Sequence, residues 1–121
     1  IRLIAAGALA AALRWALTAL APPLPLLFLV QALHAFTFGA VFLGSVEFIA
    51  RATPPRLVNT AMTLMASTGV GVATAFATFA GGFLYEWRGP AAMYALMSAM
   101  GLAAFAITLV LGRLWRAEIT N

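Results

Sequence analysis

The stretch LRWALTALAPPLPLLFLVQALHAF, residues 13–36, consists of two apolar segments joined by a proline-rich turn. Arg14 lies eight residues before the first proline of this turn, Pro22, and His34 lies nine residues after the last, Pro25. At the α-helical rise per residue, both side chains fall roughly 12–14 Å below the same membrane surface. That depth is near the middle of a hydrocarbon core about 30 Å thick. Ionisable groups there are costly and usually mark a substrate or ion pathway, so we expect Arg14 and His34 to face each other in a functional site.

The composition of the whole chain requires an apolar solvent. Hydrophobic residues make up 64% of the 121 residues and charged residues 8%, and the mean hydropathy is +1.03. A soluble domain of this length cannot bury so much apolar surface, so the lipid bilayer is the expected partner. The short alternating segments of a transmembrane barrel are not visible. We therefore predict an all-α, polytopic membrane protein.

Four membrane spans are predicted, at residues 3–21, 24–50, 57–85 and 91–114. Each is long enough to cross a bilayer. The connections between them are short and rich in proline or glycine, which end helices, so consecutive spans should be antiparallel.

The arginines predict the orientation of these spans. They give a pI near 11.3, but they are dispersed and form no basic patch, so no nucleic-acid partner is expected. Antiparallel spans place five of them on one membrane surface: Arg2, Arg51, Arg56, Arg113 and Arg116. The other surface has Arg88, partly offset by Glu86. By the positive-inside rule we expect both ends of the chain to be cytoplasmic, in the inner (plasma) membrane.

The residues around His34 are candidates for a substrate and proton site. His34 has the one side chain here that is suited to proton exchange near neutral pH, and Gln31 and Thr37 lie about one turn to either side of it. Arg14 keeps its charge and is suited to attracting an anion. The simpler alternatives are a hydrogen-bonded core histidine and an arginine that clamps backbone carbonyls.

The third and fourth spans carry weaker patterns. A ladder of small residues predicts close approach of another helix to the third span: Gly69, Ala73, Ala77 and Gly81. Hydroxyls on a different face either bond to preceding carbonyls or line an aqueous path: Thr60, Ser67, Thr74 and Thr78. The fourth span has few polar residues, and we expect it to be a peripheral, lipid-facing packing helix.

No pattern supports an enzyme. The chain contains no metal-binding cluster, no nucleophile with its base and no phosphate-binding glycine loop in a nucleotide-binding context. We expect no enzymatic activity and no cofactor apart from the proton as a coupling ion.

Three pieces of sequence resemble a known transporter family: residues 13–38, the motif EFIAR at 47–51, and AGGFLYEWRGPAAMYAL at 80–96. They are similar to the second half of major facilitator superfamily proton symporters, chiefly the phenylpropionate-permease group and more distantly lactose permease. The resemblance implies that the chain is a C-terminal fragment containing helices nine to twelve of twelve. The missing N-terminal helices would then be its partners.

The resemblance also implies roles for the candidate residues. Arg14 and His34 match an arginine and a histidine of the proton-coupling network in lactose permease, whereas Thr37 stands where that network has a carboxylate. The implied function is proton-coupled symport of a small organic acid such as an aromatic carboxylate. Arg14 would attract this anionic substrate, and Gln31 and Thr37 would hydrogen-bond to it or to water.

Two other functions fit the residues less well. Small multidrug exporters have four helices and a similar length, but they need a membrane-embedded acid in the first helix, where this chain has Arg14. A membrane scaffold or assembly subunit would use Arg14 and His34 only to join helices.

Overall fold

Helices make up nearly all of the chain. The computed structural model describes the backbone of residues 1–120 and the side chains of residues 1–115. Its elements are α1 (Arg2–Ala19), α2 (Leu24–Ala52), η1 (Pro55–Leu57), α3 (Val58–Leu64), η2 (Met65–Val72), α4 (Ala73–Arg88) and α5 (Pro90–Thr120). η1 is a short 3₁₀-helix, and η2 is a π-helical segment that joins α3 to α4 without a break. The described backbone contains no strand.

Four of these helical stretches are long and apolar enough to cross a membrane: Arg2–Ala19, Leu24–Ala52, Pro55–Arg88 and Pro90–Trp115. They confirm the prediction of an all-α protein with four spans. The turns form where the sequence predicts them. Ala21, before the prolines, has a φ of 49°, and Gly89 has a φ of 82°, a backbone conformation that glycine adopts at little cost.

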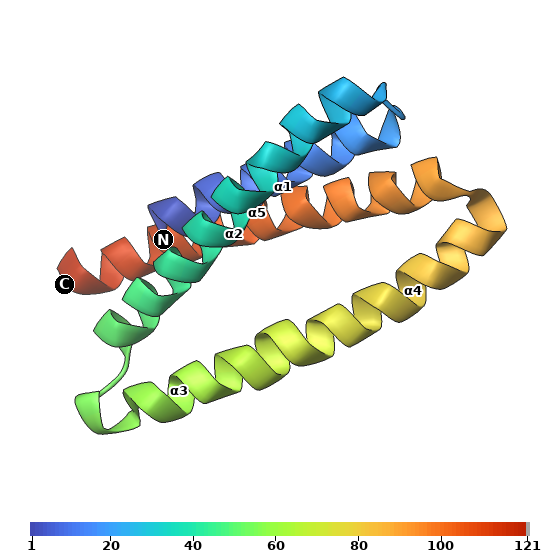
Figure 1. The fold of residues 1–121 in the computed structure, drawn as a ribbon. Helices are drawn as coiled ribbons and strands as arrows, with labels where there is room; N and C mark the ends of the chain where they lie inside the picture. The colour runs from blue at the N-terminus through green and yellow to red at the C-terminus, as the bar shows by residue number, and fades with distance from the viewer. Residues whose placement is uncertain (121) are drawn as a thin grey trace.

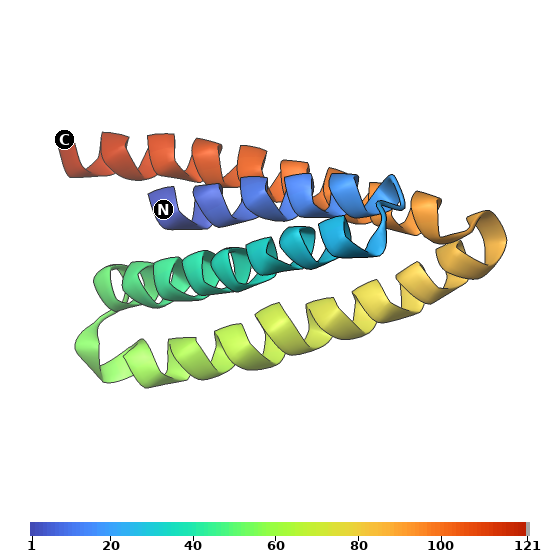
Figure 2. The same ribbon diagram turned by 45° about the horizontal axis from the view of Figure 1, so that its top comes forward.

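The helix α1 lies at the centre of the packing, because it contacts both α2 and α5 (Figures 1 and 2). The continuous rod formed by α3, η2 and α4 diverges from these three helices, and contacts α2 and α5 chiefly near its ends. No residue of α3 or η2 is buried, and in α4 only Gly81 is. The candidate site therefore belongs to the packed group of α1, α2 and α5.

Small residues bring these three helices close together. A Cβ added to Gly7 of α1 would lie 2.7 Å from Val41 Cγ2, and one added to Gly44 of α2 would lie 2.7 Å from Ile4 Cγ1. On α5, a Cβ at Gly101 would lie 2.9 Å from the backbone of Ala12. These glycines permit backbone approach of the kind that stabilises helix pairs in membranes.

This packing bears on two predictions. The helix α5 packs along α1 and most of its described residues are exposed, as expected of a peripheral packing helix. The ladder in the third span brings no helix close at Gly69, where an added Cβ would meet only Met65 of the same rod, 3.8 Å away. Its last member, Gly81, does face Met93 and Met97 of α5, at 3.6 Å and 3.4 Å. Among the described residues, the predicted close approach is thus present at Gly81 and absent at Gly69.

Hydroxyl groups around η2 bond to their own helix. Ser67 Oγ donates to the carbonyl of Thr63 at 2.8 Å, and Thr68 Oγ1 donates to the carbonyl of Leu64 at 2.5 Å. The alternative in which the hydroxyl bonds to a preceding carbonyl of its own helix is therefore confirmed for Ser67. Thr60, Thr74 and Thr78 make no side-chain hydrogen bond to any described residue.

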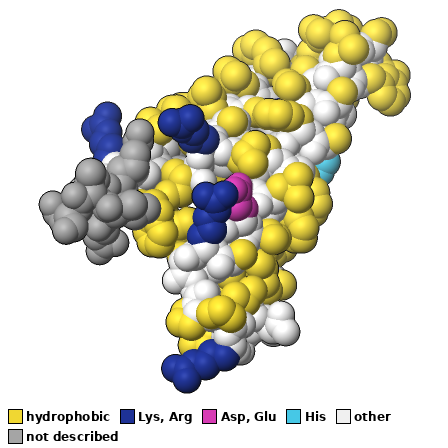
Figure 3. All heavy atoms as spheres, turned by 90° about the vertical axis from the view of Figure 1, so that its left-hand side faces the viewer, with side chains coloured by type: hydrophobic (Ala, Val, Ile, Leu, Met, Phe, Trp, Pro, Cys, Tyr) yellow, Lys and Arg dark blue, Asp and Glu magenta, His cyan; other side chains and the backbone are white. Residues whose placement is uncertain are grey.

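Arginine side chains gather at the end of the molecule that carries the chain's N-terminus and the connection from α2 to α3 (Figure 3). Arg2 begins α1, Arg51 lies in the last turn of α2, and Arg56 lies in η1. Arg88 ends α4 at the opposite end. The predicted charge asymmetry is thus present in the fold; the side chain of Arg116 lies outside the described residues.

Candidate functional site

Arg14 is the buried charge of the bundle. Its residue is 6% exposed, on a helix whose other buried residues are small: Ala5, Gly7, Ala8, Ala12 and Thr18. Nη1 donates to Oε1 of Gln31 on α2 across 3.4 Å, and Nε is buried with no hydrogen-bond partner among the described residues. A buried guanidinium with such sparse hydrogen bonding requires a further acceptor.

An aromatic pair lies beside this guanidinium. Arg14 Cζ is 3.8 Å from the ring centroid of Trp15. The Trp15 ring stacks on Tyr94 of α5, with centroids 5.6 Å apart and an interplanar angle of 13°. Sequence reasoning assigned no role to Trp15 or Tyr94. The signal that was available is the placement of an aromatic residue directly after a membrane-embedded arginine, which permits a cation–π contact.

The same region of α5 is fixed to α1 by a hydrogen bond. Ser98 Oγ donates to the carbonyl of Ala12 at 2.8 Å, one helical turn after Tyr94. Between membrane helices such a hydrogen bond contributes about 0.6–2 kcal/mol. It links α1 to α5 one turn from the Trp15–Tyr94 stack.

The structure brings Arg14 together with Gln31 and does not bring it together with His34. The His34 residue is exposed, and the ring neighbours Phe38, with centroids 6.4 Å apart. Gln31 lies three residues earlier on α2 and takes the position facing Arg14. The prediction that Arg14 and His34 share a depth thus led to the wrong direct partner, because depth does not fix the rotation of a helix about its axis.

Thr37 is buried, and its Oγ1 donates to the His34 carbonyl at 2.9 Å. The hydroxyl proton is therefore committed to the helix backbone, and only the oxygen lone pairs remain to accept a hydrogen bond. Thr37 is thus hydrogen-bonded to the His34 backbone within α2, and it makes no hydrogen bond to Arg14.

No acid in the described part of the chain compensates Arg14. Among residues 1–115 the carboxylates are Glu47, near the end of α2, and Glu86, near the end of α4. Glu47 accepts a hydrogen bond from Arg51 across 2.6 Å, a pair one helical turn apart on an exposed surface. Within those residues, no three His, Cys, Asp or Glu side chains lie close enough to hold a metal ion.

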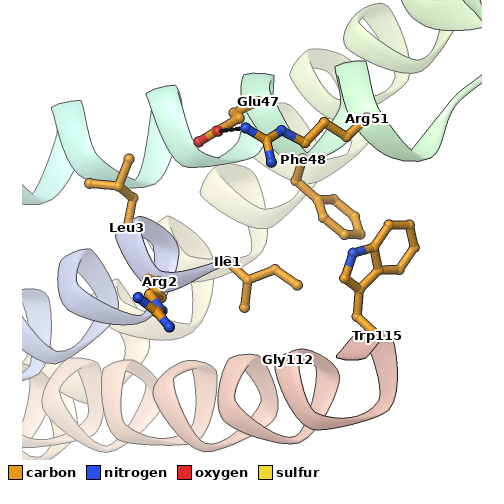
Figure 4. Close-up of a pocket in the computed structure, with 8 residues that line it drawn as sticks. All are labelled: Ile1, Arg2, Leu3, Glu47, Phe48, Arg51, Gly112 and Trp115. Carbon is orange, nitrogen blue, oxygen red and sulfur yellow. Dashed lines mark hydrogen bonds and ion pairs between the residues drawn. The ribbon is translucent and has the colours of Figure 1, made fainter. Parts of the chain in front are cut away.

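A cavity of about 320 Å³ opens at the arginine-bearing end of the bundle (Figure 4). In Figure 4, Phe48 of α2 and Trp115 of α5 point toward one another, with ring centroids 5.4 Å apart. The lining residues are Ile1, Arg2, Leu3, Glu47, Phe48, Arg51, Gly112 and Trp115. None of the four residues predicted to bind substrate or proton lines this cavity.

Comparison with known proteins identifies similar sequences. The model of the MFS_1 like family matches residues 1–96. The uncharacterized transporter YwbF of Bacillus subtilis (strain 168) is 32% identical over 98 residues, which cover 81% of this chain and 25% of that protein. Maltose permease of Geobacillus stearothermophilus is 27% identical over 113 residues, which cover 93% of this chain and 29% of the permease. The chain thus spans between a quarter and a third of the length of these relatives, and no solved structure matches it.

Proposed function

The chain belongs to the MFS_1 like family of transporters, and from this premise we propose that it is the C-terminal part of a proton-coupled symporter for a small organic acid. It is a multi-pass membrane protein, and its relatives are transporters and not enzymes. The four spans would be helices nine to twelve of twelve, with both ends of the chain on the cytoplasmic side of the inner membrane. The N-terminal helices of the same transporter would complete the site. In facilitators, substrate sites lie near the bilayer midplane between repeats.

One observation supports an anionic substrate most strongly: Arg14 is buried within α1, five residues before the end of that helix at Ala19, with no carboxylate near it in the described residues. A charged arginine in such a place needs an opposite charge, because an uncompensated buried ion is strongly destabilising. We propose that the carboxylate of the substrate supplies it when bound. An aromatic carboxylate, as the phenylpropionate-permease resemblance implies, would supply this charge, and Gln31 would add a hydrogen bond.

His34 is our candidate for exchanging the coupling proton. Histidine is a common proton-exchanging side chain in proteins, and the exposed position of His34 on α2 would leave it open to the central pathway. Thr37 would accept a hydrogen bond from water or substrate through its free lone pairs. A carboxylate from the N-terminal helices would complete the proton pathway, since Thr37 stands where the resembling permease has an acid.

A sugar is the second candidate substrate. The similarity to maltose permease favours it, whereas the uncompensated charge of Arg14 favours an acid. Membership of the facilitator family argues against a small multidrug exporter, and the scaffold function predicts no transport. A transport assay separates these possibilities.

Replacing His34 by Ala in the complete transporter should abolish proton-driven accumulation of the substrate. The imidazole provides the group that binds and releases the coupling proton, and alanine removes that group without adding bulk. The measurement is uptake of a radiolabelled carboxylate into cells, divided by the amount of transporter in the membrane fraction. Equal losses of uptake and of membrane expression would instead assign His34 a structural role, as in the scaffold alternative.

A further inference from the structure

We infer that Trp15 and Tyr94 are positioning residues, which hold the guanidinium of Arg14 so that the edge formed by its Nε and Nη2 groups receives the carboxylate of the substrate. This edge is called the Nε edge below. This inference rests on the proposed function, because it takes Arg14 as the group that binds the anion. It adds α5 to the parts of the chain that determine affinity. It concerns how the arginine is oriented, and neither ring needs to touch the substrate.

The position of the Arg14 side chain requires a support. Consecutive residues on an α-helix point about 100° apart, so the Arg14 side chain must bend toward its neighbour for the guanidinium to reach the Trp15 ring. An arginine side chain loses considerable rotamer entropy when it is held in one conformation. The contact of 3.8 Å between Arg14 Cζ and the Trp15 ring centroid stabilises this conformation.

Trp15 is itself held in place from α5. Its ring is nearly parallel to that of Tyr94, and offset stacking of this kind adds to the energy of apolar contact. Two contacts set the position of α5 along α1: Ser98 bonds to the Ala12 carbonyl, and Gly101 lies directly against Ala12. They place Tyr94 against Trp15, whose ring in turn contacts Arg14.

The hydrogen bonds of the guanidinium show which edge is available. Arg14 Cζ lies over the Trp15 ring, and the five N–H groups of a guanidinium point outward in its plane. Nη1 donates to Gln31, Nε is buried without a partner, and Nη2 donates to no described residue. The Nε edge matches the geometry in which arginine binds a carboxylate through two parallel hydrogen bonds.

Uptake kinetics of the complete transporter in proteoliposomes test this inference, with radiolabelled 3-phenylpropionate as the probe. Tyr94→Leu keeps apolar volume and removes the stack, so the KM should rise about 3- to 10-fold, the effect of losing an aromatic pair, with a smaller change in kcat. Tyr94→Phe keeps the stack and should retain the original KM. Trp15→Leu removes the other ring and should reproduce the rise.

The matched control is Trp115→Leu. It removes the Phe48–Trp115 pair, which also joins α5 to another helix but lies among the residues of the end cavity, away from Arg14. The KM should not change in this variant. The inference is overturned if Tyr94→Leu and Trp15→Leu raise the KM no more than Trp115→Leu, or if Tyr94→Phe is as impaired as Tyr94→Leu. Failure of the proposed function would look different: the unaltered transporter would take up no 3-phenylpropionate, or Arg14→Gln would transport it as well as the unaltered protein does.

Discussion

Replacing Arg14 by Gln should reduce carboxylate uptake by the complete transporter at least about 30-fold, since losing one partner of a buried charge pair costs about 2–5 kcal/mol. Glutamine keeps a hydrogen-bond donor but removes the charge that would compensate the substrate carboxylate. The side chain is 6% exposed, so water cannot replace it effectively. Initial uptake rates of labelled 3-phenylpropionate, normalised to membrane-inserted protein, measure the effect.

Arg14→Lys is the matched control for this result. Lysine keeps the positive charge and loses the planar fork, so uptake should fall to a level between those of the unaltered protein and of Arg14→Gln. If Arg14→Gln transports carboxylates normally, the proposed anion site is wrong. If Lys and Gln reduce uptake equally, the geometry of the guanidinium matters more than its charge.

Replacing Gly101 by Ala should destabilise the transporter by about 1–3 kcal/mol, the usual cost of overpacking a well-packed contact. The new Cβ would lie 2.9 Å from Ala12 Cα and N and 3.0 Å from its Cβ. Backbone atoms cannot rotate away as a flexible side chain can, so α1 and α5 would have to separate. The measurement is the temperature at which half of the detergent-solubilised protein has aggregated, which should fall by several degrees.

Gly82→Ala provides the control for this substitution. Gly82 also lies within a helix, and a Cβ added there meets nothing within 4 Å. Both replacements bring the same gain of about 1 kcal/mol in helix propensity, so a difference between them isolates the contact with Ala12. Equal melting temperatures for the two variants would show that α5 does not pack against α1 in the way the structure has it.

The membrane class and the four spans could be predicted because they follow from local properties of the sequence. Long apolar runs require helices in a bilayer, and Pro22, Pro23 and Gly89 interrupt helices whatever the surrounding fold. The arginine asymmetry likewise depends only on the order of the spans. Predicting these features requires no information about which helices pack together.

The helix contacts could not be predicted in the same way. Gly101 has no pattern around it that distinguishes it from Gly69, yet of these two glycines Gly101 alone faces the backbone of another helix. Arg14 meets Gln31 and not His34, because the partner depends on how α1 and α2 are rotated, which residue spacing does not determine. Trp15 and Tyr94 are 79 residues apart, so their stacking is visible only after α1 and α5 are packed.

Uptake of labelled 3-phenylpropionate and of labelled maltose into proteoliposomes, with and without an imposed pH gradient, tests the proton-coupled acid symport most directly. The expected result is accumulation of the carboxylate that requires the gradient, disappears when a protonophore collapses it, and is lost in Arg14→Gln. Gradient-driven accumulation of maltose without carboxylate uptake would contradict an acid substrate. Carboxylate uptake that is the same with and without the gradient would contradict proton coupling.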